Sequence, residues 1–335
     1  MPPLVSILIP AYNARHLVAQ TIRSALDQTW REKEIIVVDD GSTDGTARAV
    51  KEFESEGVRL IQQKNQGAAA ARNTAFAQSR GDYIQWLDAD DLLAPDKIEK
   101  QISAGGGGNH PRLLLSSAWG SFLHRTRAAK FNPTPLWESL SPVEWLCRKC
   151  ETGAFMQTAC WLVSRQISET AGAWNTRLLG DDDGEYFCRA LLASERTHFV
   201  PEAKVFYRVP TTNNLSYIGR SDRKMEAHFV SMELHLKYLM SLGETPRTKS
   251  AGIRYLQLWL ISFYPERMDL VEKLKSMARG LGGELETPKL SWKYRWIQKA
   301  FGWNAAKSAQ RTYNGSKVRL LHKVDHIRYQ RESAQ

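Results

Sequence analysis

Hydrophobic and polar positions alternate along the amino-terminal half of the chain in a way that predicts strands and helices in turn. Short apolar runs at 4–9, 34–40, 58–63 and 82–88 have the length of buried strands. Between them apolar residues recur at helical spacing, most clearly in "HLVAQTIRSALDQ", for which Asn13 is the predicted cap. The order β-α-β-α-β is typical of a parallel sheet covered by helices, so the predicted fold class is α/β.

The pattern changes toward the carboxyl terminus. A further strand is expected over 112–123, and "SPVE" at 141–144 has the Ser, Pro and Glu that start a helix. We expect a strand at "TACWLVS" and a helix at "EYFCRALLAS". From about residue 223 only helical patterns remain, which predicts one α/β domain over 1–220 and a helical subdomain over 221–335.

Composition places the chain among folded globular proteins. It has 335 residues, of which 42% are hydrophobic, enough for a large core. The sequence begins without the pattern of a signal peptide, and "YLQLWLISFY" is about half as long as a membrane-spanning helix. Cys147 and Cys150 form a lone C-x-x-C without a second ligand pair, so reduced thiols in a cytoplasmic protein are expected instead of a zinc site.

The positive charge is concentrated at the end of the chain. The net charge is +10, and residues 289–335 hold eleven Lys or Arg against two acidic residues. Trp292, Trp296, Phe301 and Trp303 are interleaved with these cations. This composition suits the headgroup region of an anionic membrane, which predicts peripheral contact with the inner face of a membrane. Packing of the tryptophans on the rest of the fold is the alternative interpretation, and nucleic acid is not an expected partner.

Three carboxylates, Asp88, Asp90 and Asp91, follow the fourth predicted strand. Open α/β sheets bind their ligands at the carboxyl ends of the strands, where the loops diverge. In an extended segment Asp88 and Asp90 project to the same side and can share one cation, and oxygen ligands suit Mg²⁺ or Mn²⁺. The alternative is that Asp90 or Asp91 caps a helix near Pro95.

A second acidic pair, Asp39 and Asp40, ends the second predicted strand. Acids at this place can accept hydrogen bonds from a base or from ribose hydroxyls, and Tyr12 adds an aromatic ring at the same edge. Together these residues predict a nucleoside pocket. The glycines do not fit a phosphate-binding loop, so a diphosphate would need a metal on Asp88 and Asp90, helped by Arg72.

These residues carry a resemblance to a known family. The segments "VSILIPAYNARHLVAQTIRSALDQTW", "EIIVVDDGSTDGT", "NQGAAAARNTAFAQSRGDYIQWLDADD" and "GDDDGEYFCRAL" resemble the inverting family 2 glycosyltransferases. The similarity extends roughly over residues 4–216. It implies a GT-A fold, which is a Rossmann-like, mostly parallel sheet flanked by helices, here with a helical carboxyl-terminal extension. The region 1–220 would then be the catalytic domain.

The resemblance also implies roles for individual residues. Asp88 and Ala89 would contact the donor, and Asp88 with Asp90 would hold Mn²⁺ or Mg²⁺. The residues implied to bind the nucleotide are Pro10, Tyr12, Asp39, Asp40 and Arg72.

An acidic pair ahead of Arg189 is implied to supply the catalytic base. Asp183 is the first choice for this base and Asp182 the second, and Asp182 would also cap the helix that follows. Many relatives have a histidine after a Tyr-Arg pair, where this chain has Pro210. The metal site would then depend on Asp90 and water.

The predicted function is transfer of a sugar from a nucleotide-diphosphate sugar, with UDP-sugars expected, to a glycan or lipid-linked acceptor, with inversion. The alternative is a non-catalytic nucleotide-sugar-binding or assembly protein of a polysaccharide pathway, which would be expected to lack one of the acidic sets. A nucleotidyltransferase is disfavoured because "IPAYNARHL" is not a glycine-rich basic loop.

Overall fold

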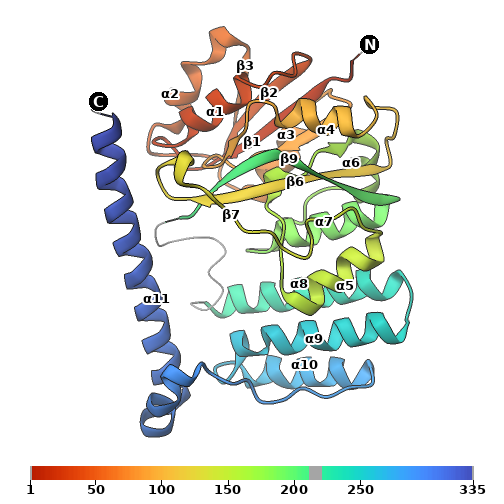
Figure 1. The fold of residues 1–335 in the computed structure, drawn as a ribbon, viewed down its shortest axis with the longest axis vertical. Coiled ribbons are helices and arrows are strands. Elements are labelled where there is room, and N and C mark those ends of the chain that lie inside the picture. Colours follow the sequence, from red (N-terminus) through yellow and green to blue (C-terminus); the bar gives the residue numbers. More distant parts are fainter. Residues whose placement is uncertain (1, 211–220, 334–335) are drawn as a thin grey trace.

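The computed structural model describes residues 2–210 and 221–333. Its central sheet has five strands in the order β3-β2-β1-β4-β8 (Figure 1). Strand β1 pairs in parallel with both β2 and β4, and only β8 runs antiparallel. The predicted mostly parallel sheet is therefore confirmed. The strands are β1 (Val5–Ala11), β2 (Lys33–Asp39), β3 (Val58–Gln62), β4 (Tyr83–Trp86) and β8 (Val163–Ser164).

Helices flank this sheet because each buries one apolar face on it. Every residue of β1 is buried, as expected for a central strand covered on both faces. Asn13 does not cap the first helix as predicted. Its side chain instead accepts a hydrogen bond from the backbone nitrogen of Thr43, 2.9 Å away. The flanking helices are α1 (Val18–Leu26), α2 (Thr46–Lys51), α3 (Ala68–Ala77), α4 (Lys97–Ala104), α6 (Arg165–Ala171) and α7 (Asp182–Ala193).

A second, smaller sheet packs beside the first, in the order β5-β9-β6-β7. Its long strand β9 was not predicted, because Pro201, Glu202 and Lys204 interrupt the apolar pattern. The segment "TACWLVS" is a short 3₁₀ turn followed by β8, so the strand predicted there is much shorter than expected. The strands are β5 (Leu92–Leu93), β6 (Leu113–Phe122), β7 (Lys130–Phe131) and β9 (Arg196–Arg208).

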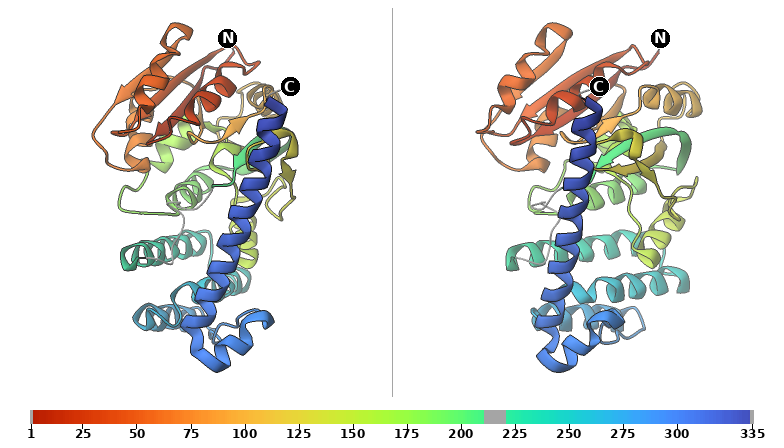
Figure 2. Two further views of the ribbon diagram at one scale, coloured as in Figure 1. Left: turned by 90° about the vertical axis from the view of Figure 1, so that its left-hand side faces the viewer. Right: turned by 60° about the vertical axis from the view of Figure 1, so that its left-hand side comes forward.

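The carboxyl-terminal part is helical, as predicted. Helices α8, α9 and α10 lie in layers beneath α7, and α11 runs back along the side of the molecule toward the second sheet (Figures 1 and 2). Within the described residues, no helix combines the length and hydropathy needed to cross a bilayer. The helices of this part are α8 (Asp222–Ser241), α9 (Pro246–Phe263), α10 (Met268–Gly280) and α11 (Arg295–Ser333), and α5 (Pro142–Thr152) of the preceding part packs against α9.

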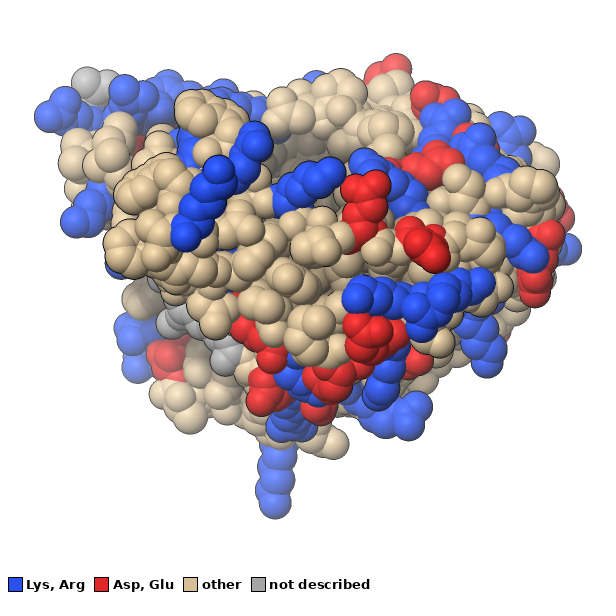
Figure 3. All heavy atoms as spheres, turned by 90° about the horizontal axis from the view of Figure 1, so that it is seen from below, with Lys and Arg blue, Asp and Glu red and all other residues tan. Residues whose placement is uncertain are grey.

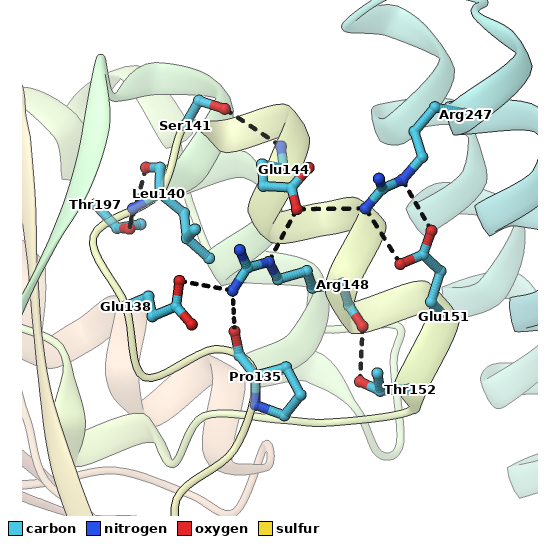
Figure 4. Close-up of polar contacts among 10 residues, drawn as sticks. All are labelled: Pro135, Glu138, Leu140, Ser141, Glu144, Arg148, Glu151, Thr152, Thr197 and Arg247. Atoms are coloured by element: carbon cyan, nitrogen blue, oxygen red, sulfur yellow. Dashed lines mark hydrogen bonds and ion pairs between the residues drawn. The ribbon is translucent and has the colours of Figure 1, made fainter.

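Helices α5 and α9 join the two parts of the chain. Ser141 caps α5 as predicted, since its hydroxyl accepts a hydrogen bond from the Glu144 nitrogen. Arg247 of α9 forms ion pairs with Glu144 and with Glu151 of α5, at 3.3 and 2.9 Å (Figure 4). Glu144 also pairs with Arg148 at 2.9 Å. A domain boundary at 220/221 stays a proposal, and it falls at the edge of the undescribed segment 211–220.

The four cysteines fit the prediction of reduced thiols. Cys147 and Cys150 are free and buried, and so are Cys160 and Cys188. Burial raises the pKa of the Cys150 and Cys160 thiols to about 12, which keeps them protonated and unreactive. These thiols are core residues.

The contributions of buried packing in α9 and of its surface ion pairs with α5 can be compared with two substitutions. Leu256 is fully buried, so Leu256→Ala should lower the free energy of unfolding by about 2–5 kcal/mol. Arg247→Ala removes only half-exposed ion pairs and should cost less than about 1 kcal/mol. Urea unfolding followed by circular dichroism measures both free energies. Equal effects would contradict the expectation that buried packing contributes more than the ion pairs of Arg247.

Candidate active site

The carboxyl ends of β1, β2 and β4 bring the predicted nucleotide residues to one edge of the sheet. Tyr12 follows β1 with 54% of its surface exposed, whereas Pro10 is buried within the strand opposite Val38. Asp39 ends β2, and Asp88 follows β4. The structure therefore gathers the side chains that the sequence suggested, with an exposed aromatic ring at the rim.

Asp40 organises the loop between β3 and α3. Its carboxylate accepts hydrogen bonds from the Gln63 side chain at 2.7 Å and from the backbone nitrogens of Gln66 and Gly67 at 3.0 and 2.8 Å. Asp39 is also buried and accepts a longer bond, 3.4 Å, from the Ser42 nitrogen. Asp39 thus keeps more free acceptor capacity than Asp40, whose contacts fix the loop that leads into α3.

Arg72 of α3 connects two acidic sets that lie far apart in the sequence. Its terminal nitrogens donate to Asp88 at 2.7 Å and to Asp182 at 2.8 Å. The guanidinium stacks over Trp174, 4.3 Å from the ring centre, and is almost completely buried. Burial alone would lower the pKa of Arg72, but the charges of Asp88 and Asp182 outweigh it and raise the pKa.

Arg208 of β9 fixes the backbone of the D-x-D segment through hydrogen bonds. The Arg208 side chain donates to the Asp90 carbonyl at 2.8 Å, and its backbone nitrogen donates to the Asp91 carboxylate at 2.8 Å. Gln157 donates to the other Asp91 oxygen, also at 2.8 Å. Asp91 is thus a fully buried structural residue and does not cap a helix. The carbonyl of Ala89 accepts a hydrogen bond from Thr21.

The carboxylate of Asp90 is the part of this segment that fits a cation. Within residues 2–210 and 221–333, no other residue donates a hydrogen bond to it. Burial and the charge of Asp88 raise the pKa of Asp90 to about 6. Two neighbouring carboxylates, one of them with a raised proton affinity, match a cation that takes oxygen ligands. The described residues hold no group of three or more His, Cys, Asp or Glu side chains arranged as metal ligands, so the remaining ligands would be donor phosphates and water.

The second acidic set lies at the amino-terminal end of α7. The helix begins at Asp182, and Asp181 before it has φ of 57°, a left-handed conformation that is uncommon for aspartate. Ser231 of α8 donates to the Asp181 carboxylate, and His235 lies 3.8 Å from it. Burial lowers the pKa of His235 to about 4, so its ring is neutral near pH 7. The turn therefore depends on a helix from the carboxyl-terminal part of the chain.

Asp183 has the properties expected of a base that works near neutral pH. Burial, together with the charges of Asp182 and Asp181, raises the pKa of Asp183 to about 7. Its carboxylate accepts a hydrogen bond of 3.4 Å from Thr158. Asp182 differs, because one of its oxygens is taken by Arg72. The helix cap predicted at Asp182 is wrong, since Asp182 is already the first helical residue.

Several residues of the site carry no clear signal in the sequence. Arg208 and Gln157 lie in segments without a motif, and Ser231 and His235 lie on a helix with an ordinary amphipathic pattern. Arg208 ends the Tyr-Arg pair, but the family resemblance draws attention to this pair only because a histidine usually follows it, and it implies no role for the arginine. Pro210 is the last residue described before a gap, and 211–216, which the predicted family similarity also included, lies outside the described residues.

Comparison with known proteins confirms the family resemblance. Residues 6–108 match the model of "Glycosyl transferase family 2". Over 101 residues the chain is 44% identical to the Escherichia coli UDP-Glc:alpha-D-GlcNAc-diphosphoundecaprenol beta-1,3-glucosyltransferase WfgD, and over 99 residues 48% identical to the E. coli chondroitin synthase. The aligned parts are 30% and 29% of this chain and span 40% of WfgD and 14% of the chondroitin synthase.

Solved structures share the fold over most of the chain. TarS 1-349 from S. aureus, in complex with UDP-GlcNAc, superposes with a TM-score of 0.65 at 15% identity, covering 83% of this chain and 81% of that one. The mannosyltransferase PcManGT from Pyrobaculum calidifontis, in complex with GDP-Man and Mn²⁺, gives 0.54 at 17% identity, covering 97% and 88%. The GT-A fold expected from the sequence is confirmed.

The raised pKa of Asp183 predicts how stability depends on pH. A carboxyl with a higher pKa in the folded state stabilises the fold at low pH, and this stabilisation is lost as the pH rises through about 7. At pH 8 the buried charge of Asp183 should therefore oppose folding. Asp183→Asn should raise the free energy of unfolding at pH 8 by at least ~1 kcal/mol, and by less at pH 5.

Urea unfolding at the two pH values, with EDTA present, measures this difference. Asp96→Asn is the matched control, because Asp96 is half-exposed and its side chain pairs with Lys100 at the surface. A stabilisation by Asp183→Asn that is equal at pH 5 and pH 8 would contradict the raised pKa.

Proposed function

We propose that this chain is an inverting, metal-dependent glycosyltransferase. It would move a sugar from a nucleotide-diphosphate sugar, with UDP-sugars as the expected donors, to a hydroxyl group of a cell-surface glycan or lipid-linked precursor. The observation that carries the proposal is the Arg72 bridge, which sets the acidic pair in the first turn of α7 beside the D-x-D segment. A donor site and a base are both needed for the transfer, and this contact brings candidates for each together.

The donor would lie across the carboxyl edge of the central sheet. Tyr12 offers an exposed ring on which a base can stack, and Asp39 has acceptor capacity for the base or ribose. The diphosphate would then lie over Asp88 and Asp90. TarS and PcManGT, which share the fold, have been solved with UDP-GlcNAc and GDP-Man, which supports a nucleotide-sugar donor.

Asp88 and Asp90 are the residues that would hold Mn²⁺ or Mg²⁺. The ion would supply positive charge to the departing nucleoside diphosphate, whose leaving is otherwise opposed by its own negative charge. Arg72 lies beside this position, but its terminal nitrogens already bind Asp88 and Asp182. Its contribution would be to position these carboxylates and to offset part of their charge.

Asp183 would act on the acceptor. A sugar hydroxyl is a weak nucleophile, and Asp183 would accept its proton as the oxygen attacks the anomeric carbon. The bond from the anomeric carbon to the donor phosphate breaks on the opposite face, so a single displacement inverts that carbon. The protonated carboxyl of Asp183 and a nucleoside diphosphate are left, and no covalent intermediate forms.

The acceptor class follows from similarity and from the charge of the chain. WfgD, by its name, acts on a diphosphoundecaprenol-linked sugar, which supports a lipid-linked or surface glycan acceptor. Such an acceptor requires the chain to reach a membrane surface, for which 289–335 is the predicted contact. A non-catalytic nucleotide-sugar binder remains the alternative, and it would bind the donor without turnover.

Removal of the proposed base should separate binding from catalysis. Asp183→Asn should lower kcat for sugar transfer, or for donor hydrolysis when no acceptor is known, by about 10²–10⁴-fold. Donor affinity, measured by calorimetry, should change only a few-fold. The same assay on Asp182→Asn tests the choice between the two carboxylates, since a larger loss of kcat there with intact donor binding would assign the base to Asp182.

Removal of the proposed metal ligand should act on the donor instead. Asp90→Ala should abolish the dependence of UDP-sugar binding on Mn²⁺ and reduce turnover by at least about 10²-fold, because the charge on the leaving group is no longer offset. Asp96→Ala, which removes a half-exposed acid paired with Lys100, is the control. Full metal-dependent turnover by Asp90→Ala would overturn the assignment.

A further inference from the structure

Helix α11 is attached to the rest of the molecule at its two ends. After a break at Gly302, where φ is 82°, it runs about 45 Å back toward the second sheet, at 1.5 Å per residue. Near its start Lys307 donates to the carbonyls of Ile261 and Tyr264 at 3.0 and 2.7 Å. The views in Figure 2 show the helix standing along the side of the molecule, so one of its faces points outward.

The far end of α11 is fixed by the loop after β6. Arg125 pairs with Asp325 and Glu332, both at 2.7 Å, and the backbone nitrogen of His124 donates to Asp325 at 3.0 Å. The ring of His322 is buried and packs on His124 with 5.5 Å between centres. These contacts fix the rotation of the helix about its own axis, and therefore also fix which residues face away.

The outward face carries an apolar stripe. Tyr313, Leu320, Val324 and Ile327 follow one another at intervals of seven, four and three residues, which places them on one side of a helix, opposite His322. Leu320 is 63% exposed, and Leu321 beside the stripe is half exposed. A helix that already buries one face has no need of a second apolar stripe for folding, so this stripe points to an external partner.

The segment before the break at Gly302 adds exposed aromatic residues. Trp292 and Phe301 are each 70% exposed and Trp296 is 64% exposed. Lys293 lies 6.0 Å from the ring centre of Trp292. Seen from this end of the molecule in Figure 3, basic side chains stand on a largely uncharged surface, while the acidic side chains gather mostly on the other part of the face.

Charge decides which partner fits. The two acidic residues of α11, Asp325 and Glu332, are engaged on the inner side by Arg125. The exposed charges on the rest of the helix are therefore basic, and a second copy of this helix would meet like charge. A nucleic acid would satisfy the cations but would leave the aliphatic stripe in water. The flanking basic residues are Lys317, Arg319, Lys323, Arg328 and Arg331.

We propose that the outer face of α11, with the aromatic segment around Trp292, Trp296 and Phe301, is a surface that binds an anionic lipid bilayer. The helix would lie in the plane of the headgroups, with aliphatic and aromatic side chains in the interface and the basic residues beside lipid phosphates. This surface does not depend on the proposed transfer reaction.

The proposal has a geometric consequence for the candidate active site. Arg208, which holds the Asp90 carbonyl, also donates to the carbonyl of Leu123 at 3.4 Å. The next residue, His124, is bonded to α11. A bilayer against the outer face of α11 would therefore be separated from the D-x-D segment by the thickness of this helix, about 10 Å, and by one short loop.

Sedimentation with vesicles tests this surface in the full-length protein. We expect binding to vesicles of phosphatidylcholine and phosphatidylglycerol, weakened by salt, and little binding to phosphatidylcholine alone. The triple variant L320S/V324S/I327S should bind the anionic vesicles about tenfold or more weakly. The variant V230S/M268S is the matched control, because it removes exposed apolar side chains outside α11 and should bind like the wild type.

Two further measurements separate lipid binding from misfolding and from loss of the reaction. Circular dichroism and hydrolysis of a soluble donor should be unchanged in L320S/V324S/I327S, which distinguishes a failure of this proposal from a failure of the proposed reaction. A K317Q/K323Q/R328Q variant should lose the preference for anionic lipid. The proposal is overturned if the wild type ignores anionic vesicles, if the triple variant binds as well as the wild type, if duplex DNA or RNA binds in place of vesicles, or if the stripe supports only self-association.

Discussion

The candidate site depends on one constraint, which is the crowding of negative charge at one edge of the sheet. Asp88, Asp90, Asp182 and Asp183 come from two distant parts of the chain, and burial, together with the charges of neighbouring carboxylates, raises the pKa of Asp90, Asp182 and Asp183. Arg72 is the buried cation that bridges two of them, and its stacking on Trp174 fixes its position. One cation cannot offset so many carboxylates, so the site favours added positive charge or protons. Both are what the proposed reaction would bring to it.

The helical part of the chain contributes to the candidate site, because α8 fixes the turn that carries the second acidic set. Asp181 adopts a left-handed conformation, and a Cβ at position 184, where the chain has glycine, would meet the Asp181 carboxylate. Helix α8 secures the arrangement, with Ser231 on Asp181 and Tyr238 donating to Glu185 at 2.6 Å. Strain at such a turn is tolerated where surrounding contacts fix it. The α/β part and the helical part of the chain therefore build the candidate site together.

Much of the site could be predicted from the sequence, for physical reasons. Buried parallel strands give unbroken apolar runs, so the ends of β1, β2 and β4, and with them Tyr12, Asp39 and Asp88, were visible directly. Strand β9 was not, because its exposed positions carry Pro201, Glu202 and Lys204, and with it Arg208 was missed. Contacts such as Ser231 to Asp181 join residues fifty positions apart, and no local pattern encodes them. The interpretation of Asp91 and Asp182 as caps failed because tertiary hydrogen bonds and the true start of α7 decided their roles.

The two-point attachment of α11 limits how this helix can change in length. Between Lys307 and His322 no residue is buried in the part of the chain that the structure describes, so the two anchored ends are related by the helical twist. One inserted residue in that span would rotate the far end by about 100° and turn Asp325 away from Arg125. An insertion before Leu320 would turn Leu320, Val324 and Ile327 by the same angle, so that the apolar stripe would no longer face outward. An insertion of seven residues would nearly restore the rotation but would move Asp325 by about two helical turns along the axis. This span of α11 can therefore accept substitutions, whereas a change in its length would break the contact with Arg125.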